Sequence, residues 1–433
     1  MKDHVFQFDF LNDDFSTLPQ GLQDIINDEN ERKKLIIYIN PPYGECGRAG
    51  SVGMNNKFGI ANTNKTHEKY TKELGKASRE LYALFFTRIF NEIPLCKIAC
   101  FAKLKALNAP NFSSFRTMFP ANLERLFVVP ANSFDNVSGQ FPIGFFIWNT
   151  ENQEKFKRIS ADVFDKTGKN IGKKKFFCYD NEKGLINDWI DDYKQEGEPI
   201  GALSCKLNDF QNANMVYVGN TKSQLPVGAK GIDITCNNLI PASIYFTVRK
   251  ILPADWLNDR DQFLYPKKTW KKDTEFQNNC LVYTLFSNNI QSKHGVNHWI
   301  PFLEREVNAR DKFDSHFMMS FISGKIIQNR YADLFERDGD ANFIKREFST
   351  EAKAVFNAGR KLWTYYYAQP KCNVNASLYD IREHFQGRNA NGKMNNKSVD
   401  ETYNGLISAL RSALKTLAEK IEPKVYEYGF LKE

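Results

Sequence analysis

The feature that most constrains this chain is a short apolar run that ends directly in an asparagine and two prolines. Residues 35–39 read LIIYI, and Asn40, Pro41, Pro42 and Tyr43 follow. Two successive prolines fix two φ angles, remove two backbone donors and force the preceding residue out of the helical region. The apolar run has the length of a buried strand rather than a helix. The sequence therefore predicts a strand that leaves its sheet as a stiff, extended element.

The first 150 residues alternate between predicted strands and helices. Strands are predicted at 5–11, 35–39, 95–102, 124–130 and 141–148, and helices at 67–92 and 111–119. The segment 12–34 is predicted to be a loop with a helical turn, and residues 44–66 to be a glycine-rich loop. This order predicts a mostly parallel α/β sheet, in which ligands bind at the carboxyl ends of the strands. The asparagine–proline element falls at such an end.

The pattern changes after residue 150. Residues 155–345 contain a predicted hairpin around Lys169–Lys175 and period-two runs at 243–251 and 279–286. They are therefore predicted to be mixed structure, rich in strands and long loops.

From residue 350 the chain is predicted to be helical. A capping box at Ser398–Glu401 opens a helix with a leucine stripe that runs to Pro423, and the stripe is expected in the core rather than at a partner interface. We expect three domains, at 1–150, 151–348 and 349–433.

Composition limits the class of protein. The formal charge of +8 over 433 residues suits an anionic partner such as nucleic acid, although solvated surface lysines also explain a modest excess. The eight cysteines are scattered without a CxxC pair, which favours a reducing cytoplasm. No apolar run approaches the length of a membrane span. His294 and His298 have no partners at ligand spacing, so no metal site is predicted.

The asparagine–proline element suits one kind of chemistry. The side-chain carbonyl of Asn40 and the backbone carbonyl of Pro41 supply two acceptors that point the same way. An exocyclic amine on a base is a poor nucleophile because its lone pair is delocalised into the ring. Two acceptors bonded to its N–H groups make the nitrogen more tetrahedral, and the ring of Tyr43 can stack on a base removed from the helix. A rigid turn without function is the alternative.

These residues resemble motif IV of the DNA adenine-N6 methyltransferases, in the gamma order, in which the target-recognition domain follows NPPY. The resemblance implies that Asn40 and Pro41 accept hydrogen bonds from the target amine, that Pro42 fixes the turn and that Tyr43 stacks on the base. The likeness extends over about 35–150 and implies a Rossmann-like catalytic domain.

A second motif resembles the same family. Phe8–Leu11 is similar to the family's Asp-Phe motif about thirty residues before NPPY. The resemblance implies that Asp9 accepts from the adenine amine of S-adenosylmethionine and that Phe10 packs on its ring. It also implies that Phe134 lies against the flipped base, with Phe141 as the other candidate in a shifted alignment.

The sequence departs from the family at the cofactor site. The family holds S-adenosylmethionine in an FxGxG turn and by a carboxylate, both before the Asp-Phe motif, and only eight residues precede Asp9. The FxGxG turn follows a buried strand and opens a helix. Neither Gly228–Gly231 nor Thr167–Asn170 has that position in the sequence, so neither segment replaces the turn. The expectation is an N-terminally truncated, incomplete catalytic domain with an unpaired sheet edge and an uncovered face. The cofactor-binding half then comes from a second polypeptide, or the gene is disrupted.

A recognition domain contacts phosphates with basic side chains and reads bases with polar ones. Arg48 and Lys57 lie in the glycine-rich loop, and this loop is expected to adjoin the target-base pocket. The candidate DNA-binding residues are Arg48, Lys57, Lys173, Lys174, Lys175, Arg249, Lys250, Lys267, Lys268, Trp270, Lys271 and Lys272. Exposed surface is the alternative for each lysine run. Residues 373–388 either contact DNA or pack the helical tail.

The sequence thus predicts an incomplete α/β methyltransferase domain, then a mixed α+β target-recognition domain and a helical C-terminal region. The expected function is site-specific DNA adenine-N6 methylation in a restriction–modification system, with double-stranded DNA as partner and S-adenosylmethionine as cofactor. One alternative is a non-catalytic DNA-binding or specificity subunit. Another is a methyltransferase that acts on an RNA base or a protein glutamine. No carboxylate cluster supports a nuclease.

Overall fold

The chain folds into two units, each with its own hydrophobic core. The computed structural model describes residues 5–41, 64–135, 137, 139–180, 183–326 and 345–433. Unit 1 comprises Met1–Glu182 and Asp255–Asp261, and unit 2 comprises Lys183–Ala254 and Gln262–Glu433. The limits of these units differ from the domain limits at 150 and 348. A strand hairpin after residue 150 joins the first sheet, and the C-terminal helices share one core with residues 183–326.

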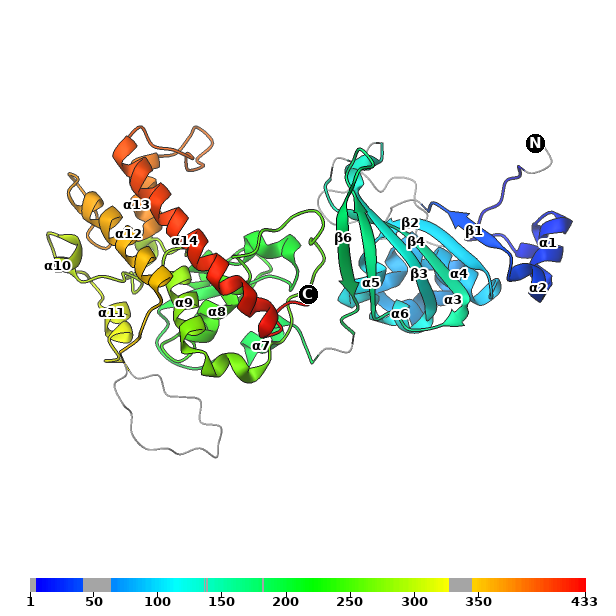
Figure 1. Ribbon diagram of the computed structural model, residues 1–433, viewed down its shortest axis with the longest axis horizontal. Helices are drawn as coiled ribbons and strands as arrows, with labels where there is room; N and C mark the ends of the chain where they lie inside the picture. Colours follow the sequence, from blue (N-terminus) through cyan, green and yellow to red (C-terminus); the bar gives the residue numbers. More distant parts are fainter. Residues whose placement is uncertain (1–4, 42–63, 136, 138, 181–182, 327–344) are drawn as a thin grey trace, which may run out of the picture. The chain divides into compact units, whose positions relative to one another are not determined.

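Unit 1 is built on a six-stranded mixed sheet in the order β1-β2-β4-β3-β5-β6 (Figure 1). Its strands are β1 (Ile36–Ile39), β2 (Lys97–Lys103), β3 (Ala121–Pro130), β4 (Pro142–Gln153), β5 (Arg158–Phe164) and β6 (Asn170–Phe177). The pairs β1–β2 and β3–β5 are parallel, and the other three pairs are antiparallel. The apolar runs therefore form strands as predicted, but the sheet is mixed rather than mostly parallel, because β4 returns between β2 and β3.

Helices cover one face of this sheet. The helices of unit 1 are α1 (Gln20–Asn27), α2 (Glu29–Arg32), α3 (Lys65–Leu74), α4 (Leu81–Glu92), α5 (Lys105–Asn108) and α6 (Ser113–Met118). The side chains of Ile98, Cys100 and Phe146 point to the covered face, are fully buried, and share a core with α4. The helix predicted at 67–92 is interrupted because Gly75 has a φ of 56° and a 3-10 turn follows it.

The N-terminal segment differs from the prediction. Residues 5–9 are extended but belong to no strand of the described chain. Val5 is 80% exposed and Phe6 is 45% exposed, because no neighbouring strand covers them. The following segment, 12–34, contains α1 and α2 rather than a loop with a single helical turn. The predicted buried strand at 5–11 is therefore wrong.

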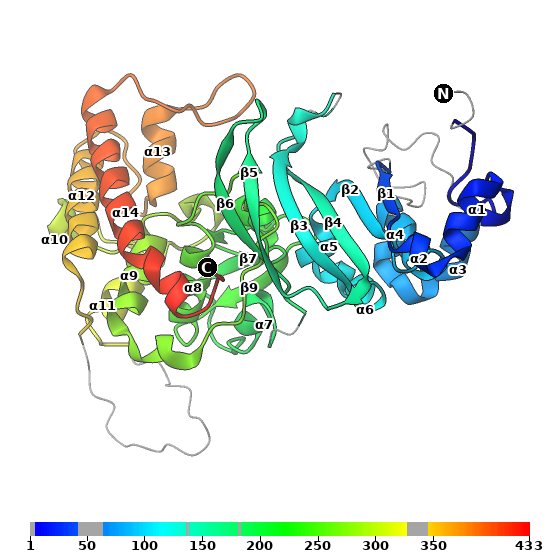
Figure 2. The same cartoon turned by 45° about the vertical axis from the view of Figure 1, so that its right-hand side comes forward.

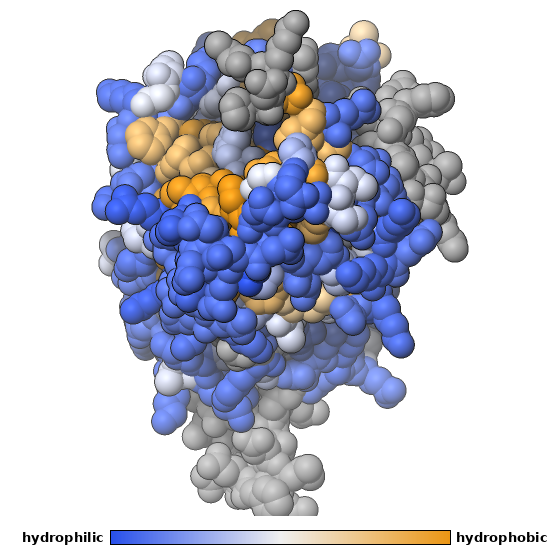
Figure 3. Space-filling model, turned by 90° about the vertical axis from the view of Figure 1, so that its right-hand side faces the viewer, coloured by the Kyte–Doolittle hydropathy of each residue, from blue (hydrophilic) through white to orange (hydrophobic). Residues whose placement is uncertain are grey.

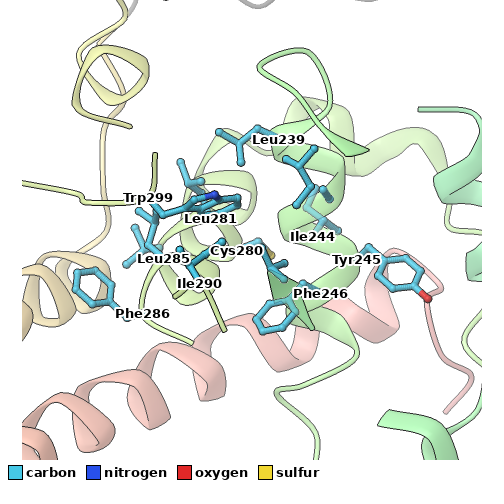
Figure 4. Packing of buried hydrophobic residues seen from close by; sticks show 14 of the residues in the cluster. Leu239, Ile244, Tyr245, Phe246, Cys280, Leu281, Leu285, Phe286, Ile290 and Trp299 are labelled. Atoms are coloured by element: carbon cyan, nitrogen blue, oxygen red, sulfur yellow. The ribbon is translucent and has the colours of Figure 1, made fainter. Parts of the chain in front are cut away.

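Unit 2 combines a small sheet with helices. Its strands are β7 (Gly201–Cys205), β8 (Val218–Gly219) and β9 (Lys230–Ile234), in the antiparallel order β8-β7-β9. Its helices are α7 (Ile186–Asp191), α8 (Leu239–Val248), α9 (Thr274–Leu285), α10 (Glu304–Val307), α11 (Phe317–Ile322), α12 (Thr350–Tyr367), α13 (Leu378–Gln386) and α14 (Glu401–Glu427). Figure 4 shows side chains of α8 and α9 meeting in the core of this unit.

The strand-rich prediction for residues 155–345 is wrong at its two period-two runs. Residues 243–251 and 279–286 lie in α8 and α9 or at their ends. Every residue of α8 is buried, so this helix has no polar face to reveal a helical period. A fully buried helix and a buried strand cannot be separated by apolar periodicity.

The C-terminal helices confirm the predicted stripe. Leu410, Leu417 and Ile421 are buried on α14 and belong to the core of unit 2. The cap differs, because the N-cap is Asp400, whose side chain accepts from the backbone N–H of Tyr403, while the hydroxyl of Ser398 accepts from the N–H of Asp400 itself. The helix also continues through Pro423 to Glu427.

Candidate functional site

The asparagine–proline element lies at the carboxyl end of β1. Asn40 is exposed and Pro41 is buried. β1, β2 and β3 run in the same direction, because β4 is antiparallel to both β2 and β3. Phe134 follows β3 after one 3-10 turn. It therefore lies at the same end of the sheet as Asn40, where the carboxyl ends of β1, β2 and β3 are found. The ring centroids of Phe134 and Phe101 are 5.2 Å apart, which places an aromatic pair at this end.

Four predicted site residues lie outside the described part of the chain. They are Pro42, Tyr43, Arg48 and Lys57. Their roles remain the predictions made from the sequence.

The Asp-Phe motif is held by local hydrogen bonds and by ring packing. The carboxylate of Asp9 accepts from the side-chain nitrogen of Asn12 at 2.7 Å and from the backbone N–H of Leu11 at 3.0 Å. These bonds, that of Asn12 first, lower the pKa of Asp9 against the opposing effect of burial. The ring of Phe10 stacks on Phe85 of α4 with centroids 4.9 Å apart.

Arg88 of α4 clamps this motif in place. Its guanidinium donates to the backbone carbonyl of Phe10 and, at 2.6 Å, to that of Asp13. Its Nε donates to Glu92 at 2.9 Å, and its guanidinium carbon lies 4.3 Å from the ring centroid of Phe15. Sequence analysis missed this residue. The available signal was a single arginine inside the apolar run of the helix, where a cation needs partners.

The outer edge of β1 is apolar and free of strand partners among the described residues. β1 pairs only with β2 there. Ile36 is 65% exposed and Tyr38 is 61% exposed. Figure 3 looks onto this end of unit 1 and shows an apolar patch surrounded by polar side chains. Edge strands are usually protected by charge, proline or a bulge, and none of these occurs within β1.

An aromatic row crosses the sheet face opposite the helices. Neighbouring rings in this row have centroids between 4.7 and 6.4 Å apart, and every ring is at least partly exposed. The row consists of Tyr38 (β1), Phe101 (β2), Phe145 (β4), Phe127 (β3) and Phe164 (β5). The row begins at Tyr38, on the edge strand β1. This face therefore combines with the edge of β1 into one apolar surface.

The lysines of β6 fall into two groups. Lys173 and Lys175 are exposed, and Lys173 lies 3.8 Å from Asp162. Lys174 is partly buried and pairs with Asp261 at 2.6 Å. Lys173 and Lys175 stay available for phosphate, whereas Lys174 has a structural partner.

In unit 2 the residues predicted to contact DNA also fall into two groups, one buried and one exposed. Trp270 is 4% exposed and lies within 5.7 Å of Trp189 by ring centroids, so we remove it from the candidate stacking residues. Lys267 and Lys268 are exposed, although Lys267 donates to the backbone carbonyl of Glu427 at 3.0 Å.

Arg249 has a structural role instead of a phosphate contact. It is fully buried and donates to the backbone carbonyls of Leu207 and Asp209, both at 2.8 Å. Lys250 donates to the carbonyl of Ala213 at 2.7 Å, and burial lowers its pKa to about 8.

The segment 373–388 packs the helical tail. Phe385 of α13 stacks on Tyr365 of α12 with centroids 5.7 Å apart, and on Tyr403 of α14 at 4.4 Å. Of the two roles that the sequence left open, the packing role is the one observed for this segment.

Comparison with known proteins does not identify the class of this protein. No family model, no curated protein and no solved structure matches the chain. Within the described ranges, no three His, Cys, Asp or Glu side chains gather as metal ligands do. A helix with both the length and the apolarity to cross a membrane is also absent from those ranges.

Proposed function

We propose that this chain carries the target-base half and the recognition part of a site-specific DNA adenine-N6 methyltransferase. The observation that carries the proposal is the place of Asn40 and Pro41, at the carboxyl end of β1 and at the same sheet edge as Phe134. Two acceptors and an aromatic pair at one edge suit an extruded base whose amine attacks a methyl group.

In this reaction the N6 amine of adenine would form a bond to the methyl carbon of S-adenosylmethionine as the carbon–sulfur bond breaks, and S-adenosylhomocysteine would leave. The side-chain carbonyl of Asn40 and the backbone carbonyl of Pro41 would accept from the amine, and the N6 proton would pass to solvent after transfer. Phe134 and Tyr43 bracket the base. S-adenosylmethionine supplies the methyl group when it is bound, and Asp9 and Phe10 contact its adenine. The exposed carboxylate of Asp9 fits that role, since its exposure leaves it accessible to an amine donor.

A second polypeptide completes the cofactor site in this proposal. Along its outer edge β1 pairs with no strand of the described residues, and the partly exposed aromatic row lies beside that edge. A strand of the second polypeptide would pair with the edge of β1, and a helix beside that strand would cover the aromatic row. The recognition of double-stranded DNA then falls to unit 2.

The primary test is methyl transfer from radiolabelled S-adenosylmethionine. The chain is co-expressed with the protein encoded beside it, and plasmid DNA, total RNA and a protein extract are offered as acceptors. We expect label in DNA only. Asn40→Ala should reduce transfer about 100-fold while DNA affinity is unchanged, because it removes one acceptor of the amine. Label in RNA or protein, or full transfer by the variant, would overturn the proposal.

The partner is tested separately by isothermal titration. The isolated chain should bind S-adenosylmethionine weakly, because Asp9 and Phe10 are only part of a site. Micromolar affinity in the isolated chain would show that no second polypeptide is needed.

A further inference from the structure

A polar hairpin extends away from the helices of unit 2 between α13 and α14 (Figures 1 and 2). It spans residues 387–400, which we call the 387–400 hairpin. Its two arms meet in a bridge between Arg388 and Met394. From the sequence, residues 387–388 belonged to the segment predicted to contact DNA or pack the helical tail, and Ser398 to the predicted capping box, while residues 389–397 had no predicted role.

The base of the hairpin is fixed to the helices on either side. The backbone N–H of Asn395 donates to the carbonyl of Gly387 at 3.0 Å, and its side chain donates to the carbonyl of Gln386 at 2.9 Å. The hydroxyl of Ser398 donates to the carbonyl of Phe385 at 2.6 Å. The side chain of Asn404 on α14 donates to the carbonyl of Ser398 at 2.9 Å.

The tip is also ordered by its own hydrogen bonds. The side-chain oxygen of Asn389 accepts from the backbone N–H groups of Asn391 and Lys393, both at 3.0 Å. Gly392 has a φ of 72°, which allows the tight turn. The guanidinium of Arg388 donates to the carbonyl of Gly392 at 2.7 Å and pairs with Glu383. The backbone is therefore held in one conformation before any partner binds.

The exposed polar side chains that take no part in these hydrogen bonds carry ammonium or amide groups. Residues 388–399 contain three basic residues, four asparagines and no acidic residue. Asn391, Lys393, Asn396 and Lys397 are exposed, and their side chains form no hydrogen bond or ion pair with the described residues. Arg388 is already engaged, so the free positive charge comes from the two lysines.

We propose that the 387–400 hairpin contacts double-stranded DNA, with Lys393 and Lys397 on phosphates and Asn391 and Asn396 at base edges. The inference rests on the proposed function, since it assigns part of the recognition surface. Lysine contacts phosphate as a point charge, and asparagine can bond an adenine edge through two groups. The two arms of the hairpin are joined by one backbone bridge, and the major groove, which is about 12 Å wide, admits a pair of antiparallel chain segments.

The composition of the hairpin favours DNA over a protein partner. Protein interfaces are depleted in lysine and have an apolar core. In the hairpin only Val399 is a large, exposed apolar side chain. An ordered backbone also reduces the conformational entropy lost on binding.

The test measures how DNA affinity depends on salt. The full chain is titrated against a labelled mixed-sequence duplex by fluorescence anisotropy over a series of salt concentrations. Each phosphate contact contributes a slope of about 0.9 in log K against log salt. The double variant Lys393→Ala/Lys397→Ala should therefore reduce the slope by about 1.8. Both lysines are exposed, so the fold should be retained, and circular dichroism checks this.

A control pair separates a local contact from a general loss of charge. Lys353→Ala/Lys361→Ala removes two exposed lysines of α12 from the same unit and should leave the slope unchanged. A wild-type slope in the hairpin variant, or an equal loss in both variants, would overturn the inference and leave the proposed function standing. Failure of the unmodified chain to bind DNA at any salt concentration would overturn both.

Discussion

At the scale of single residues, two arginines show how buried cations organise this chain. Arg88 and Arg249 each direct their guanidinium groups to backbone carbonyls of segments distant in sequence. Such charge-assisted hydrogen bonds contribute about 1.5–3 kcal/mol each. The place of each arginine inside an apolar run indicates that the cation needs partners, but the sequence does not show whether those partners are backbone carbonyls or phosphates. Arg249 was for this reason predicted to contact phosphate.

Replacement of Arg88 should release the Asp-Phe motif. Arg88→Met keeps the length of the side chain but removes the donors to the carbonyls of Phe10 and Asp13. We expect faster hydrogen exchange in residues 9–15 and a loss of about 2 kcal/mol in the free energy of unfolding. Mass spectrometry and urea denaturation measure the two effects. Arg79→Met, at an exposed position, is the matched control and should change neither. Unchanged exchange in the Arg88 variant would mean that ring packing and the local hydrogen bonds of Asp9 hold the motif without Arg88.

At the scale of elements, the two edges of the first sheet differ in how they are protected. β6 carries Lys173 to Lys175 along its length, and charge on an edge strand opposes pairing with another chain. β1 carries four apolar residues and no charge. The difference indicates that β6 is a native edge facing solvent, while β1 is suited to accept a further strand.

This asymmetry predicts self-association of the isolated chain through β1. Ile36→Lys/Tyr38→Lys should lower the association seen in sedimentation velocity, because it places charge on the open edge. Both side chains are more than half exposed, so the free energy of unfolding should change by less than about 0.5 kcal/mol. Ile171→Lys on β6, at a residue that is 52% exposed, is the control and should leave association unchanged. Equal association in both variants would place the contact elsewhere.

The elements also show what the sequence could and could not predict. β1, β2, β3 and β4 follow from apolar runs bounded by turn residues, and α14 follows from its leucine stripe. The position of β4 between β2 and β3 did not follow, because strand order depends on pairing between segments far apart in the chain. α8 was missed because burial on all sides removes the helical period, and α9 because its second half, from Asn278 to Leu285, is buried except for Tyr283, which is partly buried. The exposed segment 5–9 was missed because an apolar pattern does not reveal whether a neighbouring strand is present.

For the candidate site, the place at a strand end could be predicted from the sequence, but the supporting contacts could not. Asn40 and Phe134 share one sheet edge, as strand direction requires. Trp270 was misassigned because its flanking lysines suggested exposure, whereas the rings of Trp189 on α7 and of Tyr193 just after α7 pack against it. Local composition cannot distinguish an exposed tryptophan from one whose partners come from remote parts of the chain.

At the scale of the whole molecule, the chain passes between the units more than once. Residues 255–261 interrupt the sequence of unit 2 but belong to unit 1. Trp256 and Leu257 pack against the core of the first sheet, and Asp261 pairs with Lys174 of β6. Seven residues drawn from the middle of unit 2 therefore contribute to the stability of unit 1.

A substitution that removes this packing should destabilise unit 1. Trp256→Ala removes a partly buried ring from the core of unit 1, and the expected cost is about 2 kcal/mol, less than for a fully enclosed tryptophan. Hydrogen exchange should accelerate in β3 to β6 and stay unchanged in α9 and α14. Trp270→Ala, which removes a ring from the core of unit 2, should give the opposite distribution. Faster exchange in α9 and α14 of the Trp256 variant would show that residues 255–261 stabilise the unit from which they come, and that the two cores are not independent.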